Sequence, residues 1–137
     1  MAILSISILG LVYATTAGHQ HLDQADTESR AIRLAEHLLE EIHSRPYAGS
    51  GAERATWHVD DFDGFQEEPG DLKDFTAELY APEYQVYTRT ASVSSASHTL
   101  TDLDGLVVPG KTILVVLRHI DGREWNLSRF IPEPLSP

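Results

Sequence analysis

Carboxylates gather in one part of this chain, where their spacing could support metal chemistry. Between Asp60 and Glu83 the sequence has nine carboxylates and a single lysine. Loops rich in such oxygens bind calcium, and the segment 61–64, Asp-Phe-Asp-Gly, is similar to part of an EF-hand loop. In EF-hand register, however, Val59 would take the first ligand position and Gly70 the closing glutamate position. We therefore expect a solvated acidic loop. The candidates for a weak calcium site outside that pattern are Asp60, Asp61, Asp63 and Asp71.

Other motifs that carry chemistry are incomplete. Residues 40–43, Glu-Glu-Ile-His, have the Glu-x-x-His spacing of a helical metal ligand pair, but a di-iron bundle needs two such motifs and further glutamates on facing helices. His19 and His21 supply two ligands, fewer than a metal site requires. The sequence has no nucleophile elbow, phosphate-binding loop or dinucleotide fingerprint. We predict no catalytic residue, no cofactor and no enzymatic activity.

Composition limits the partners. The formal net charge of −11 argues against nucleic acid, because a phosphate-binding surface needs clustered Lys and Arg. The chain has no cysteine, which excludes disulfides and thiolate metal sites. A length of 137 residues suits one domain with an extension.

The elements that would position these residues begin with one long helix, predicted from Met1 to about Arg45. Its first part, to Gly18, is apolar around the whole helix. Its second part is amphipathic, and Pro46 ends it because proline disfavours helical geometry at the preceding residue. The apolar stripe of the second part repeats at three and four residues. The residues of this stripe that we expect to pack on the rest of the domain are Leu34, Leu38, Leu39 and Ile42.

The apolar stretch 1–18 has three interpretations: a membrane or filament helix, a cleaved signal peptide, or a buried core helix. It lies at the short end for a membrane span, no basic segment precedes it as in a signal peptide, and its apolar residues do not form one stripe. Gly10, Ala14 and Gly18 share one helical face at four-residue spacing. Small residues in that arrangement let helices approach closely, so these three are the candidate helix-packing residues.

The C-terminal half predicts strands. Residues 46–83 indicate an irregular connection, 84–93 a strand and 94–110 a further connection. Asp121-Gly122, between β-rich runs at 112–120 and 123–131, favours a hairpin with a two-residue loop. That loop would place Val116 opposite Leu127 and Arg118 opposite Trp125. The helix would then lie on a face formed by Leu114, Val116, Trp125 and Leu127.

The predicted fold class is α+β: a long N-terminal helix, apolar in its first half and amphipathic in its second, packed on a small antiparallel β-sheet. The domain organisation follows from these elements. Residues 1–18 form a membrane or filament-core segment, and residues 19–45 continue the helix into the head. Residues 46–137 form a small β-rich head, which carries the acidic loop 57–83.

The runs MAILSISILGLVYATTAG and RAIRLAEHLLEEIHSRPY resemble the N-terminal region of type IV pilin-like proteins, especially minor pilins and type II secretion pseudopilins. The family's most specific motif, a basic leader cut by a prepilin peptidase before a Phe-Thr-Leu-Ile-Glu-like sequence, is absent. The resemblance covers the first third of the chain well and the remainder only in layout. It places Met1 a few turns inside the family's helix, as a misassigned start or a trimmed chain would.

This resemblance implies a non-enzymatic structural subunit of a type IV pilus or a type II secretion-like filament. Its partners would be inner-membrane lipid and other pilin or pseudopilin subunits, contacted through the N-terminal helix. The protein would be a single-pass protein of the bacterial inner membrane, with its head in the periplasm or on an extracellular filament. The alternative is an exported or membrane-tethered small β-domain that binds a ligand through the acidic aromatic loop.

Overall fold

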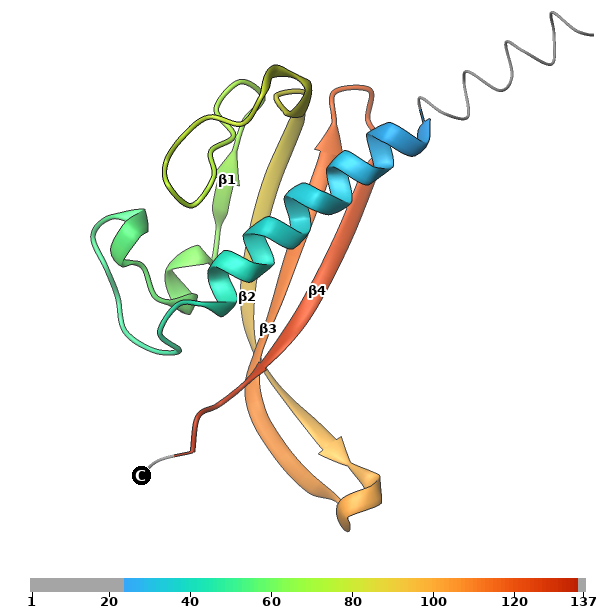
Figure 1. Ribbon diagram of the computed structural model, residues 1–137. Coiled ribbons are helices and arrows are strands. Elements are labelled where there is room, and N and C mark those ends of the chain that lie inside the picture. Colours follow the sequence, from blue (N-terminus) through green and yellow to red (C-terminus); the bar gives the residue numbers. More distant parts are fainter. Residues whose placement is uncertain (1–23, 136–137) are drawn as a thin grey trace, which may run out of the picture. The chain divides into compact units, whose positions relative to one another are not determined.

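The computed structural model describes residues 24–135, which comprise a helix at 24–43 and a four-stranded antiparallel sheet (Figure 1). The chain divides into two compact units, Met1–Arg30 and Ala31–Pro137. The contacts that follow all lie within the second unit. Its strands are β1 (Phe65–Glu67), β2 (Tyr87–Leu100), β3 (Leu106–His119) and β4 (Glu124–Pro132), each paired with the next along the chain.

The predicted fold class is wrong in its helix. The described helix covers residues 24–43 and is amphipathic, with no apolar first half. Charged side chains recur on every turn after Asp26, so its apolar residues form one stripe rather than a continuous band. Within residues 24–135, no helix combines the length and the apolar character that a membrane span requires. The apolar segment 1–18, with the candidate packing residues Gly10, Ala14 and Gly18, lies outside the described residues.

The apolar stripe of the helix packs on one face of the sheet. Leu34, Leu38 and Ile42 are fully buried, and Leu39 is 4% exposed. Their neighbours in the core include Ile113, Val115 and Leu117 of β3, together with Tyr87 and Ala91 of β2. Complete burial of a leucine contributes about 1.5–3 kcal/mol. Burial of this stripe therefore contributes several kcal/mol to the stability of the described domain.

The hairpin between β3 and β4 forms at Asp121-Gly122, but its loop is one residue longer than predicted. The amide of His119 donates to the carbonyl of Arg123 (2.8 Å), and the amide of Gly122 donates to the carbonyl of His119 (2.9 Å). Gly122 has φ +98°, the left-handed geometry that closes a three-residue loop. The loop changes the register of every pair in the hairpin.

The longer loop corrects the predicted helix-facing side of β3. Leu127 lies opposite Val115 rather than Val116, and Trp125 lies opposite Leu117 rather than Arg118. A shift of one residue turns each side chain to the other face of a strand. Val115 and Leu117 therefore face the helix, with Trp125 and Leu127 packed against the same core. Leu114 and Val116 belong to the opposite face, where Leu114 is 37% exposed.

The predicted connection at 94–110 is also wrong. β2 continues to Leu100 and β3 begins at Leu106, so most of that segment is a two-stranded ribbon that extends the sheet (Figure 1). Its Ser, Pro and Gly residues are typical of turns. The pairing to β3, however, holds β2 extended regardless of side-chain type, and even Pro109, which has no amide hydrogen, lies opposite Ser97 in the register.

Candidate functional site

Of the four aspartates proposed as weak calcium ligands, Asp60, Asp61 and Asp63 lie in or next to the short helix η2 (Val59–Phe62), and Asp71 follows β1. The first three accept hydrogen bonds from the protein. Asp61 accepts the amides of Gly51 (2.9 Å) and His58 (2.8 Å). Asp60 pairs with Lys111 at 2.9 Å, and Asp63 accepts the amide of Val93 at 2.9 Å. Asp71 is exposed. Across residues 24–135, no group of three or more His, Cys, Asp or Glu side chains is arranged to hold a metal ion.

The Glu-x-x-His pair of the helix lies at the surface. Glu40 forms an ion pair with Arg129 of β4 at 2.8 Å, and His43 is exposed. The pairing gives Glu40 a packing role between the helix and β4. His19 and His21 lie outside the described residues.

The most unusual polar group in the described domain is Arg89 of β2, which is 1% exposed. It lies directly opposite Glu67 of β1, and its Nε donates to the Glu67 carboxylate at 2.7 Å. Its Nη1 donates to the carbonyl of Leu34 in the helix (3.1 Å), and its Nη2 donates to the carbonyl of Lys73 (2.8 Å). One guanidinium therefore ties together β1, the helix and the loop that follows β1.

Arg54, from the short helix η1 (Arg54–Thr56), extends this network. Its Nε and Nη2 donate to the two oxygens of Glu41 at 2.9 and 2.8 Å, and its Nη1 donates to Glu67 at 3.2 Å. Burial alone would lower the pKa of the Arg54 guanidinium, but the hydrogen bonds and charges of Glu41 and Glu67 outweigh it and raise the pKa. Arg54 stays protonated and holds two carboxylates that the fold has buried.

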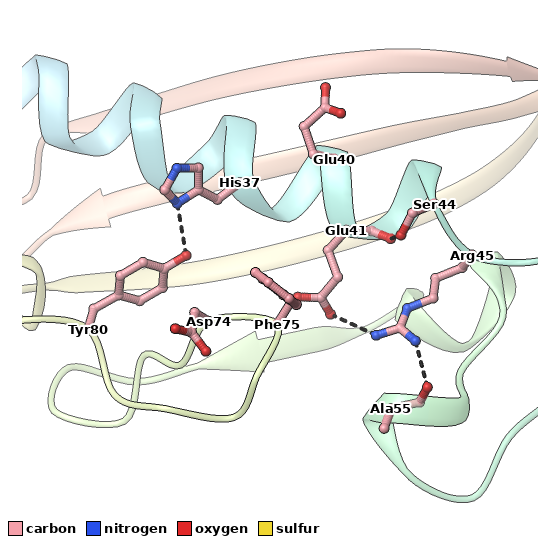
Figure 2. Close-up of a pocket in the computed structure, with 9 residues that line it drawn as sticks. All are labelled: His37, Glu40, Glu41, Ser44, Arg45, Ala55, Asp74, Phe75 and Tyr80. Carbon is pink, nitrogen blue, oxygen red and sulfur yellow. Dashed lines mark hydrogen bonds and ion pairs between the residues drawn. The ribbon is translucent and has the colours of Figure 1, made fainter.

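An open pocket of about 600 Å³ lies beside this network (Figure 2). Two strips of residues line it: one from the helix and its end, the other from the loops. The lining residues are His37, Glu40, Glu41, Ser44, Arg45, Ala55, Asp74, Phe75 and Tyr80. Phe75 is 74% exposed, whereas the carboxylate of Glu41 is engaged by Arg54 and lies 3.6 Å from Arg45.

Three side chains of the pocket differ in how they are held. His37 Nδ1 and the Tyr80 hydroxyl form a hydrogen bond of 3.0 Å, seen in Figure 2. Burial raises the pKa of Tyr80, so its hydroxyl stays protonated at neutral pH. Asp74 accepts the hydroxyl of Thr76 at 2.6 Å, and this bond is the largest cause of its lowered pKa. These contacts stabilise the loop that carries Phe75.

The contacts of Arg89 and Arg54 hold the helix, β1 and the loops together. Their guanidinium groups are bound to carboxylates and carbonyls, and the Tyr80 hydroxyl is hydrogen-bonded to His37. No family model, curated protein or solved structure matches this chain.

Only indirect signals of this network are present in the sequence. Arg89 occupies a position where strand alternation predicts a buried residue, between Tyr87 and Ala91. A cation at such a position needs a buried carboxylate as a partner. Glu67 is twenty-two residues away in the sequence, and nothing in the local pattern identifies it among the nine carboxylates of the acidic segment.

Proposed function

We propose that this chain is a non-enzymatic structural subunit of a type IV pilin-like assembly, a minor pilin or a type II secretion pseudopilin. The observation that carries the proposal is that the polar groups of the candidate site are engaged in attaching the helix to the sheet. Arg89 reaches the helix backbone at Leu34, and Arg54 binds Glu41 on the same helix. A head attached to its helix by several hydrogen bonds suits a subunit that packs into an assembly rather than an enzyme that turns over a substrate.

The sequence supports the same proposal from the other end of the chain. The apolar segment 1–18 and the stripe that begins at Ala31 have the composition of a pilin-like N-terminal region. In this function, the apolar segment would insert in the bacterial inner membrane and later contact other subunits. The head would lie in the periplasm or on the filament.

Close helix packing through Gly10, Ala14 and Gly18 provides a direct test. Leucine at Gly10 or Ala14 leaves the segment apolar, so membrane insertion should be unchanged, but the added side chain holds neighbouring helices apart. We expect the native level of membrane-bound protein and reduced co-purification with pilin-like subunits of the host. Val12→Leu, on another helical face, is the matched control. Equal co-purification of all variants would argue against a packing role for this face.

The pocket favours a second candidate function, a tethered domain that binds a small molecule. Its volume of about 600 Å³ is in the range of ligand sites, and Phe75 offers an exposed ring at its edge. Native mass spectrometry of the full chain purified from its host would test this. A retained ligand at one copy per chain, lost in Phe75→Ala, would favour the binding function over the structural one.

A further inference from the structure

The pocket at the end of the helix is bordered by aromatic rings (Figure 2). His37 and Tyr80 face each other, with ring centroids 6.0 Å apart and ring planes 19° from parallel. The Tyr80 ring also meets the Arg89 guanidinium, which lies 5.5 Å from the ring centroid. Phe75, in contrast, is 74% exposed, and within residues 24–135 no other ring or cation is placed against its ring. The ring of Phe75 is therefore open to a ligand.

Three carboxylates line the same pocket, and two of them are already paired. Glu40 binds Arg129 of β4 at 2.8 Å, and Glu41 binds Arg54 at 2.8 Å. The third is Asp74. Among residues 24–135, no Lys, Arg or His nitrogen lies within ion-pair distance of its carboxylate. In the part of the chain that the structure describes, Asp74 is therefore the lining carboxylate without a cationic partner.

The carboxylate of Asp74 is held in place by uncharged donors. Its Oδ1 accepts the amides of Thr76 (2.8 Å) and Glu78 (3.1 Å), together with the Thr76 hydroxyl (2.6 Å). The bond from the Thr76 hydroxyl is the largest cause of the lowered pKa of Asp74, so the group is ionised at neutral pH. Because all three donors meet the same oxygen, Oδ2 stays available to a ligand.

The guanidinium that lines the pocket is engaged by the protein. Arg45 Nη1 donates to the carbonyl of Ala55 at 2.6 Å, and Nη2 lies 3.6 Å from the Glu41 carboxylate. Arg45 Nε has no hydrogen-bond partner, but it is buried and out of reach of a ligand in the open pocket. A free carboxylate oxygen and an exposed aromatic ring, from the consecutive residues Asp74 and Phe75, are therefore available to a ligand, whereas the guanidinium is not.

We propose that this pocket binds a small organic cation, a quaternary ammonium group placed against the Phe75 ring and beside the Asp74 carboxylate. The proposal rests on the ligand-binding function given above as the second candidate, and it names the chemical class of the ligand. A cation close to the face of an aromatic ring is attracted by the quadrupole of the ring. The neighbouring carboxylate adds a charge of opposite sign. The same carboxylate repels an anion, in a chain whose net charge is −11.

Hydrogen-bonding capacity favours a quaternary ammonium over other cations. A primary ammonium has three N–H donors that need acceptors, and Asp74 supplies one free oxygen. A quaternary ammonium has no N–H group, so a carboxylate and an aromatic ring are sufficient partners, as at sites that recognise choline or methylated lysine. A metal ion needs several ligands, and no group of three or more His, Cys, Asp or Glu side chains within residues 24–135 is placed to hold one.

Choline and neohexyl alcohol, the isostere in which carbon replaces the charged nitrogen, test the need for charge because they have the same shape. The full chain is titrated with each compound in a maltoside detergent, and the amide signals of Asp74 and Phe75 are followed by NMR. One cation–π contact and one exposed ion pair should make choline bind roughly tenfold more tightly than the alcohol. Equal affinities, or no binding of choline, would overturn the proposal. Glycerophosphocholine carries the same cation beside a phosphate, and tighter binding of this compound than of choline would overturn the assignment to a free cation rather than a lipid headgroup.

Two variants separate the contribution of the charge from that of the ring. Asp74→Asn removes the negative charge but keeps the Oδ1 acceptor for Thr76 and Glu78, and Phe75→Leu keeps an apolar side chain but removes the ring. Each variant should bring the affinity for choline close to that for neohexyl alcohol. Asp71→Asn is the matched control, because Asp71 is an exposed carboxylate of the same acidic segment that does not line the pocket, and this variant should keep the tenfold preference.

An unchanged preference for choline in Asp74→Asn or Phe75→Leu would overturn the proposal. The native mass spectrometry experiment remains a separate test of the binding function. A retained uncharged ligand in that experiment would overturn the assignment to a cation while it supported the binding function, so the two can fail separately.

Discussion

The two faces of the sheet use the same strands for different purposes. The helix-covered face is apolar and closed: Ile113, Val115 and Leu117 are fully buried against the helix. The outer face, which carries the even-numbered residues of β2, β3 and β4, alternates with it residue by residue, yet Leu114 in its middle is 37% exposed. The covered face also contains charged residues, and the most buried of them is Arg89, each of whose three nitrogens donates to an acceptor on another element.

The two faces therefore differ for separate reasons. Burial under the helix explains the apolar residues of the covered face, but it does not explain why the outer-face positions of β2, β3 and β4 carry so few charges. A surface with no binding role usually carries charged residues, and this chain has many elsewhere. Core packing does not explain uncharged residues at Leu114, Val116 and Leu106, because these side chains do not reach the core. Burial of the covered face stabilises the domain, whereas the outer-face residues Leu106 and Leu114 stay partly exposed.

A charge placed on the covered face should destabilise the domain far more than a charge placed on the outer face. Leu38→Asp puts an unpaired carboxylate at a fully buried position and should lower the free energy of unfolding by about 4 kcal/mol or more. Leu114→Asp should change it by less than about 1 kcal/mol. Denaturant unfolding of the full chain in detergent would measure both. Similar losses in the two variants would contradict the assignment of the faces.

The buried ion pair gives the next largest effect. Arg89→Leu leaves Glu67 with only Arg54 and the amide of Lys73 as partners, and should destabilise the domain by about 3 kcal/mol. Replacing Glu67 with leucine as well removes the unmatched carboxylate. The double variant should therefore recover part of the loss in the same unfolding measurement. A change below about 1 kcal/mol for Arg89→Leu would mean that the network contributes little.

Gly110 is an outer-face residue that is itself buried, unlike Leu114 on the same face. A Cβ atom at this position would meet the carbonyl of Ile131 and lie 2.5 Å from the ring of Phe130. Gly110→Ala should therefore lower the free energy of unfolding by about 1–3 kcal/mol, as overpacking does. Thermal unfolding would check this, with Ser94→Ala, at an exposed position of β2, as a control. An unchanged melting temperature would show that Phe130 does not pack on Gly110.

The smallest effect concerns the turn that assigns residues to the two faces. The side-chain hydrogen bond from Arg123 lowers the pKa of Asp121 from 3.8 to about 2. Because the folded pKa lies below the unfolded value, the stabilisation is present above about pH 4 and is lost as pH falls through about 2. The group is fully exposed, so the effect should be small. NMR titration of the Asp121 carboxyl would measure it, and an ordinary pKa would contradict the turn geometry.

Local sequence patterns predicted the structure best where a feature depends on a single helix or turn. The three- and four-residue spacing from Ala31 to Ile42 is enough to predict an amphipathic stripe, and the described helix buries that stripe. The Asp121-Gly122 pair is enough to place a hairpin. It does not fix the loop length, and one additional residue reverses the facing of Leu114 and Val116.

Features that depend on distant partners could not be read from the sequence. The ribbon at 94–110 is strand because β3 pairs with β2, despite its Ser, Pro and Gly residues. Arg89 is buried because Glu67 and two backbone carbonyls meet it from other elements. The calcium candidates Asp60, Asp61 and Asp63 likewise have protein donors that only the folded chain brings to them.

The structural function rests most directly on whether the mature protein keeps its apolar N-terminal segment. A pilin-like subunit needs that segment for membrane insertion and for packing through Gly10, Ala14 and Gly18, whereas a signal peptide would be removed. Mass spectrometry of the native protein from its host decides between them. The proposal predicts a mature chain that retains residues 1–18, and a mature N-terminus near Gly18 would contradict it.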